Sequence, residues 1–296
     1  MKEYVKRKLF FNFINYVEIE ISSKCNRHCS YCPSSKRNGK GELISLSIVK
    51  KILIELKSIN FQGGIAFHQY NEPLLELKHL FVCMNLVKKY LPKAKMVLYT
   101  NGDLLTKSLY KDLKRNGINE FHISRHMEKW NKDDAIKEIK AMKRKIGLHG
   151  KKSLFISESK VALVPSKLRR LSFNIKQYNF WDMKKYPTIT YIESTDFAKS
   201  GSNRMGSVET KSYNGNENPC SYFCQSMLHS MHISYRGNAY FCWDCCDGIK
   251  EAEDYLLGNI VETDMFDLFF SKCKEFGKVL LTGVELKNCQ NCVWNN

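Results

Sequence analysis

Cysteine is the residue type that most constrains this chain, because twelve cysteines occur among its 296 residues. Three of them, Cys25, Cys29 and Cys32, fall in one short segment, whereas eight occupy positions 220, 224, 242, 245, 246, 273, 289 and 292. The N-terminus is basic and then apolar, but asparagines interrupt it and no small-residue cleavage site follows, so we expect a cytoplasmic protein. In a reducing compartment, dense cysteines indicate metal binding before disulfides. The distribution therefore predicts two separate metal centres.

The middle of the chain alternates apolar strands with amphipathic helices. We expect strands at 17–21, 64–70, 96–100, 120–124, 161–164 and 189–192, separated by helices whose apolar residues recur with helical period. This alternation favours an α/β fold with a parallel sheet and crossover helices, in the form of a partial (β/α)6 TIM-like barrel. Chemistry on such barrels lies at the carboxyl ends of the strands, and the first cysteine group follows the first expected strand.

The chain changes character after the sixth expected strand. Residues 196–219 are polar and rich in Gly, Ser and Asn, which indicates a linker. We therefore expect a core domain at 1–205, with an N-terminal lead-in, and a linker with a cysteine-rich domain at 206–296. Residues 232–241 alternate apolar and polar around an Arg-Gly-Asn segment, which predicts a β-hairpin.

The net charge is +17, from 47 Lys and Arg against 30 Asp and Glu. A strongly basic chain can bind nucleic acid. Here the excess is mostly scattered lysine, which fits a solvated surface, so we do not expect nucleic acid to be the partner. No apolar run reaches the roughly 18–20 residues that a membrane-spanning helix needs.

The first cysteine group has the spacing C-x3-C-x2-C. Zinc sites usually combine paired C-x2-C segments, whereas three thiolates on one loop can ligate three irons of an iron–sulfur cube and leave the fourth open. With Tyr31 before the third cysteine, the segment resembles the signature of the radical S-adenosylmethionine (radical SAM) superfamily. The resemblance implies that Cys25, Cys29 and Cys32 ligate a [4Fe–4S] cluster that binds S-adenosylmethionine.

Further motifs of that superfamily follow the expected strands in order. Residues 69–75 occupy the place of a Gly-Gly-Glu-Pro-like motif that holds the cofactor's amino group, with the glycines replaced by Tyr70 and Asn71. Asn can tolerate the unusual dihedral angles that Gly allows. The segments 100–102 and 124–125 follow the third and fourth strands. The resemblance implies that the cofactor contacts Tyr31, Tyr70, Asn71, Glu72, Pro73, Asn101, Ser124 and Arg125.

The tail cysteines resemble the auxiliary-cluster tails called SPASM and their shortened form, called twitch. The shared elements are C-x12-G-x4-C from Cys224 to Cys242, the Gly-Asn-Ile at 258–260 and the C-terminal C-x2-C. The resemblance implies one auxiliary [4Fe–4S] cluster on Cys224, Cys242, Cys289 and Cys292. A structural zinc ion is the alternative, because four cysteines can equally close around zinc.

The resemblance implies an enzyme that generates a 5′-deoxyadenosyl radical and abstracts hydrogen from its substrate. A fully ligated auxiliary cluster favours oxidation of a sugar- or aminocyclitol-like small molecule, with epimerisation as a variant. Cys246 and Cys245 are candidate hydrogen-atom donors, or else buried thiols. The alternatives are a peptide-modifying maturase, of the RiPP or sulfatase type, and a zinc-binding nucleic-acid module. We expect an electron-donor protein such as flavodoxin or ferredoxin as a partner.

Overall fold

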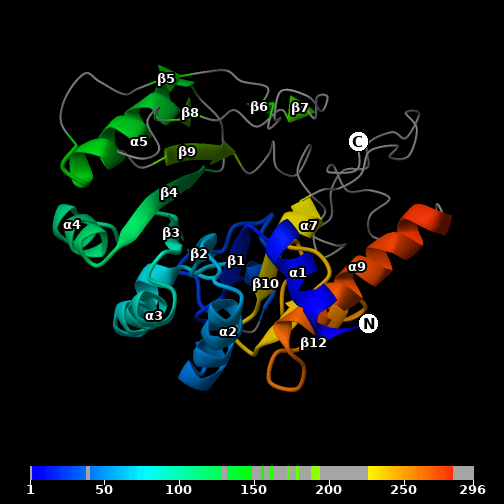
Figure 1. Ribbon diagram of the computed structural model, residues 1–296. Coiled ribbons are helices and arrows are strands. Elements are labelled where there is room, and N and C mark those ends of the chain that lie inside the picture. The colour runs from blue at the N-terminus through cyan, green and yellow to red at the C-terminus, as the bar shows by residue number, and fades with distance from the viewer. Residues whose placement is uncertain are drawn as a thin grey trace.

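Figure 1 shows the computed structural model, which describes residues 2–37, 41–127, 132–148, 155–156, 161–162, 172–173, 178–179, 188–193 and 226–282. Three expected ligands of the auxiliary cluster, Cys224, Cys289 and Cys292, lie outside the described residues. The expected domain boundary at 205/206 lies outside them as well, so that boundary stays a prediction.

One eight-stranded sheet organises the fold, in the order β12-β11-β10-β1-β2-β3-β4-β9. From β10 to β9 each neighbouring pair is parallel, and β11 and β12 are added at one edge by antiparallel pairing. The ends of the sheet do not pair with each other within the described residues, so the expected open, partial α/β barrel is confirmed. Its strands are β1 Tyr16–Ile19, β2 Gly64–Ala66, β3 Lys95–Thr100, β4 Ile118–Met127, β9 Thr188–Glu193, β10 Ser230–Ile233, β11 Asn238–Tyr240 and β12 Leu256–Asn259.

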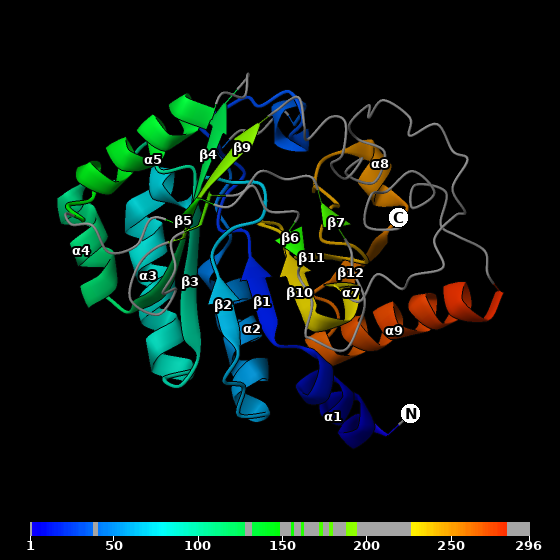
Figure 2. The same cartoon turned by 90° about the horizontal axis from the view of Figure 1, so that it is seen from above.

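Helices follow most of the parallel strands. Figure 2 shows α2 to α5 along one side of the curved sheet, with α1 and α9 side by side near its β10–β12 end. The longer helices are α1 Glu3–Phe13, α2 Leu46–Ser58, α3 Leu77–Tyr90, α4 Lys107–Arg115, α5 Lys132–Lys145 and α9 Met265–Thr282, and the short ones are η1 Pro33–Ser35, η2 Pro73–Glu76, α7 Ser226–His229 and α8 Lys250–Glu253. None of the described helices is both long and apolar enough to span a bilayer.

Helix α2 illustrates how sequence determines these elements. Ser45 caps its N-terminus, because the Ser45 hydroxyl accepts a hydrogen bond from the Ile48 amide at 3.3 Å. An apolar stripe with helical period then buries one face in the core. That stripe comprises Val49, Ile52, Leu53 and Leu56, all fully buried.

The N-terminal lead-in is also part of the core. Phe10 of α1 is fully buried, and its ring packs edge-on against Phe266 and Phe269 of α9, with both centroid distances at 5.4 Å. The first and last described helices therefore pack on each other.

One strand expectation is wrong. A strand was expected at 161–164, but its described part, β6 Val161–Ala162, pairs antiparallel with β7 Ser172–Phe173 in a separate two-stranded sheet. Likewise, in the part of the chain that the structure describes, β5 Phe155–Ile156 pairs with β8 Tyr178–Asn179 and not with the main sheet. A short apolar run specifies an extended chain but not its partner.

The place in the parallel sheet is taken by β10 from the tail. The expected hairpin is confirmed, since β10 and β11 pair antiparallel across the turn at Ser234–Gly237. The other edge of β10 pairs parallel with β1, from Tyr16 opposite Ser230 to Ile19 opposite Ile233. The tail therefore completes the sheet beside the strand that leads into the first cysteine group.

Candidate functional site

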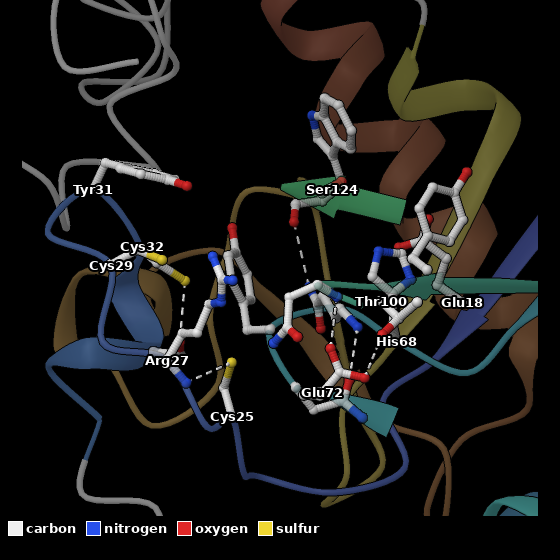
Figure 3. A pocket seen from close by; sticks show the side chains of 17 residues that line it. Glu18, Cys25, Arg27, Cys29, Tyr31, Cys32, His68, Glu72, Thr100 and Ser124 are labelled. Carbon is white, nitrogen blue, oxygen red and sulfur yellow. Dashed lines mark hydrogen bonds between the residues drawn. The ribbon is translucent and has the colours of Figure 1, made fainter. Parts of the chain in front are cut away.

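A pocket of about 290 Å³ opens at the carboxyl ends of β1 to β4. The cysteines lie on one side of this pocket, and Glu72, Thr100, His68 and Glu18 lie on the other, as Figure 3 shows. The residues that line it are Glu18, Cys25, Arg27, Cys29, Tyr31, Cys32, Ser34, His68, Gln69, Tyr70, Asn71, Glu72, Tyr99, Thr100, Asn101, Ser124 and Trp243. Most of the site residues expected from the sequence therefore meet at one place.

The loop after β1 brings Cys25, Cys29 and Cys32 to the pocket, and all three are half-buried. The loop curls because the Cys32 amide donates to the Cys29 carbonyl at 3.0 Å. Burial raises the pKa of Cys25 to about 11 and raises the pKa of Cys29 as well. Thiols in such a site ionise when a metal binds and releases their protons. The group therefore has the chemistry of a ligand set.

The arrangement of these sulfurs bears on which metal they fit. Four ligands that converge on one ion are what a tetrahedral zinc site needs. Three thiolates spread over one loop match the ligands of a multinuclear cluster better.

Asp103 ties the cysteine loop to the ends of β3 and β4. The Arg27 guanidinium donates to both Asp103 oxygens, at 2.6 and 2.7 Å. Arg125 of β4 donates to Asp103 at 2.8 Å and to the Asn101 carbonyl at 2.6 Å. These donors hold the pKa of Asp103 well below its usual range, with the Arg27 hydrogen bonds as the largest cause. Arg125, which we expected at the cofactor, therefore braces the loop and does not line the pocket.

Glu72 fixes the turn after β2. Its carboxylate accepts hydrogen bonds from the Thr100 hydroxyl at 2.7 Å, the Asn101 amide at 2.7 Å and the Leu74 amide at 3.1 Å. Burial raises the pKa of Glu72 even though these donors oppose the shift. Because a carboxylate offers about four lone-pair positions, one remains for an ammonium group in the pocket. Pro73 begins η2 and is buried beside this turn.

Asn71, which stands where the motif has a glycine, does not adopt a left-handed dihedral angle. Among the described non-glycine residues only Asn60 has a positive φ. The Asn71 side chain instead closes its own turn, since its oxygen accepts from the Gln69 amide at 3.1 Å. Gly102 supplies the positive φ in this region, at 76°.

Tyr70 connects the pocket to the tail. Its hydroxyl donates to the Asp244 carbonyl at 2.8 Å, and the neighbouring Gln69 side chain donates to the Cys245 carbonyl at 2.8 Å. Trp243, in the same tail segment, lines the pocket. The segment after β11 is therefore anchored on the turn after β2.

Three tail cysteines lie close to this anchor but are not part of the pocket lining. Cys242, Cys245 and Cys246 are all buried. Cys246 packs with Tyr70 and Cys32, and burial raises its pKa strongly. Cys245 and Cys246 are not among the residues that line the pocket, and a role for either thiol as a hydrogen-atom donor stays a prediction.

Sequence reasoning missed the side of the pocket opposite the cysteines. Glu18, His68 and Tyr99 line it, and each comes from a different strand or strand end. No local motif marks them, because they become neighbours only when parallel strands align. The available signal was the alternation of β1, where Tyr16 and Glu18 interrupt an apolar run.

Comparison with known proteins agrees with this geometry. Residues 19–148 match the family model of the radical SAM superfamily. The chain is 40% identical over 112 residues to an S-adenosyl-L-methionine-dependent 2-deoxy-scyllo-inosamine dehydrogenase of Niallia circulans. The aligned segment covers 37% of this chain and 44% of that protein. It is 34% identical over 123 residues to a GTP 3',8-cyclase of Helicobacter pylori (strain HPAG1), and this alignment covers 39% of this chain and 36% of the cyclase. These matches span less than half of either relative.

A solved structure is similar over a greater length. The crystal structure of BtrN in complex with AdoMet and 2-DOIA superposes with a TM-score of 0.61 and 25% sequence identity. The superposition covers 96% of this chain and 93% of that one. Over residues 19–148 the chain is therefore similar to the radical SAM superfamily, whose members use a [4Fe–4S] cluster and S-adenosylmethionine.

Proposed function

We propose that this chain is a radical SAM dehydrogenase that oxidises an alcohol carbon of a small polyhydroxylated ring to a ketone. The observation that carries the proposal is the pocket itself, which gathers Cys25, Cys29 and Cys32 beside Glu72, Asn101 and Ser124. When bound, the cluster and S-adenosylmethionine supply a 5′-deoxyadenosyl radical that takes a hydrogen atom from carbon.

The residues of the chain bind the cluster and the cofactor, orient the substrate and enclose the pocket. The three cysteines hold the cluster, and the Glu72 turn and Asn101 position the methionyl end of the cofactor. Ser124 at the end of β4 contributes a hydroxyl to the same pocket. Tyr31, which is 5% exposed, and Tyr70 help to exclude water, and a fixed geometry between cofactor and substrate carbon supplies much of the rate.

The choice of reaction rests on electron balance. Conversion of a secondary alcohol to a ketone removes one hydrogen atom, one proton and one electron, so the electron needs an acceptor. An auxiliary [4Fe–4S] cluster, which Cys224, Cys242, Cys289 and Cys292 would hold, would supply that acceptor. Support comes from Cys242, which is buried and directly precedes the pocket residue Trp243. An external donor such as flavodoxin or ferredoxin would reduce the first cluster.

The substrate class is supported by the relatives. One relative is named for its action on 2-deoxy-scyllo-inosamine, an aminocyclitol. Another is named for its action on GTP, a larger molecule that the test below includes.

The test follows a hydrogen atom from substrate to cofactor. The anaerobically reconstituted protein is incubated with dithionite, S-adenosylmethionine and 2-deoxy-scyllo-inosamine deuterated at its carbinol carbons. We expect one deuterium in the released 5′-deoxyadenosine and a ketone three mass units below the deuterated alcohol, because the alcohol loses one deuterium and one proton. Deoxyadenosine without deuterium, or transfer only from labelled GTP, would contradict the dehydrogenase proposal.

A further inference from the structure

A row of polar and aromatic side chains crosses the sheet beside the pocket. Glu18 of β1 is in register with His232 of β10, and His232 Nδ1 lies 2.7 Å from Glu18 Oε2. On the next strands, the His68 ring stacks on Tyr99 at 4.1 Å and Tyr99 stacks on His122 at 4.5 Å. A core-facing row of this kind is costly to bury unless it serves a ligand or a network.

Glu18 is the acidic member of that row. Its side chain is 12% exposed, and it lines the pocket on the side away from the cysteines (Figure 3). Glu18 Oε2 is hydrogen-bonded to His232, whereas Glu18 Oε1 has no hydrogen-bond partner among the described residues. A buried carboxylate with a vacant oxygen toward a pocket can accept a further charged hydrogen bond.

The surroundings keep Glu18 ionised. Burial opposes ionisation, but the nearby His232 and Lys272 outweigh it and set the pKa of Glu18 below its ordinary range. Burial lowers the pKa of His68 and His122, so both rings are neutral near pH 7. Lys272 is fully buried, donates to the Ser230 carbonyl at 3.0 Å and does not line the pocket.

We propose that Glu18 is the recognition site for a protonated amine on the substrate, and that this wall of the pocket selects amine-bearing rings over neutral ones. The inference rests on the proposed function. The stacked rings of His68 and Tyr99 provide a flat neighbouring surface against which a carbocyclic ring packs. The cysteine side holds the cofactor, so an amine at Glu18 fixes which ring carbon faces the cofactor.

The same geometry disfavours the other obvious role for Glu18. A general base works best when its pKa lies near the working pH, whereas Glu18 is held in its charged form by the groups behind it. A permanently charged, partly buried carboxylate is suited to pairing with a cation.

The test compares two substrates that differ in one group. Oxidation of 2-deoxy-scyllo-inosamine is measured against the neutral analogue in which a hydroxyl replaces the amine, with the reconstituted wild-type protein and with Glu18→Gln. We expect wild type to prefer the amine by about 10–100-fold in kcat/KM, the effect of one buried charged hydrogen bond. Glu18→Gln should reduce that ratio to near one while uncoupled cleavage of S-adenosylmethionine continues.

Two further variants make the result specific. Glu18→Asp keeps the charge and should retain part of the preference. Glu120→Gln removes a carboxylate that lies 3.9 Å from His122 but outside the pocket lining, and should leave the ratio unchanged.

Each outcome decides between the proposals. Three results would overturn the amine site: an unchanged amine-to-neutral ratio of kcat/KM in Glu18→Gln, no amine preference in wild type, or an equal loss of activity toward both substrates in the variant. Absence of S-adenosylmethionine cleavage in wild type would instead refute the proposed function.

Discussion

At the scale of single residues, the pocket depends on buried charges that lie behind it. Glu20 and Arg37 form an ion pair at 3.0 Å with side-chain exposures of 0% and 2%. Arg37 also donates to the Ser23 carbonyl at 2.8 Å, and the Tyr70 amide donates to Glu20 at 3.2 Å. This one pair therefore joins the end of β1, the segment after the cysteine loop and the turn after β2.

Removal of one member of the Glu20–Arg37 ion pair should strongly destabilise the protein. Arg37→Met leaves the Glu20 carboxylate buried with little compensation, so we expect a loss of about 3–5 kcal/mol in the free energy of unfolding. Arg115→Met, which breaks an exposed ion pair with Asp112 on α4, should cost under about 1 kcal/mol. Urea denaturation of both variants checks the difference. Equal losses would show that the buried pair does not brace the site.

At the scale of secondary-structure elements, the turn after β3 sets the position of Asn101. Gly102 has φ 76°, and a Cβ there would lie 2.7 Å from Met142 Cε and 2.8 Å from Ile123 Cγ2. The Gly102 amide donates to the Thr100 hydroxyl at 3.0 Å, and that hydroxyl donates to Glu72. Strain at this turn would therefore reach the Glu72 carboxylate.

A pair of glycine substitutions tests this turn. Gly102→Ala should lower stability by about 1–3 kcal/mol, because the left-handed backbone and the close contacts both oppose a Cβ, and it should weaken binding of S-adenosylmethionine. Gly277→Ala in α9, where a Cβ meets nothing within 4 Å, should instead stabilise the protein by about 0.5–1 kcal/mol. Thermal melts and equilibrium binding of the cofactor measure both effects. A Gly102→Ala variant as stable as wild type would contradict the strained-turn interpretation.

The elements also show what sequence alone can predict. Strands β1 to β4 and their helices were predictable because each carries its own apolar period, and the cysteine spacing is local as well. The pairing of β10 with β1 was not, because Tyr16 and Ser230 lie far apart in sequence. The side of the pocket formed by Glu18, His68 and Tyr99 depends on that pairing and on the alignment of the strands, so it could be identified only in the folded sheet.

At the scale of the whole molecule, one claim supports the rest: Cys25, Cys29 and Cys32 hold a cluster that cleaves S-adenosylmethionine. The direct measurement is iron content together with 5′-deoxyadenosine release under dithionite, in anaerobically reconstituted wild type, in the triple Cys25/Cys29/Cys32→Ala variant and in Cys83→Ala, a buried cysteine of α3. Two cubane clusters predict about eight irons in wild type and in Cys83→Ala, and about four in the triple variant, which should release no deoxyadenosine. Unchanged iron in the triple variant, or continued cleavage, would contradict the claim.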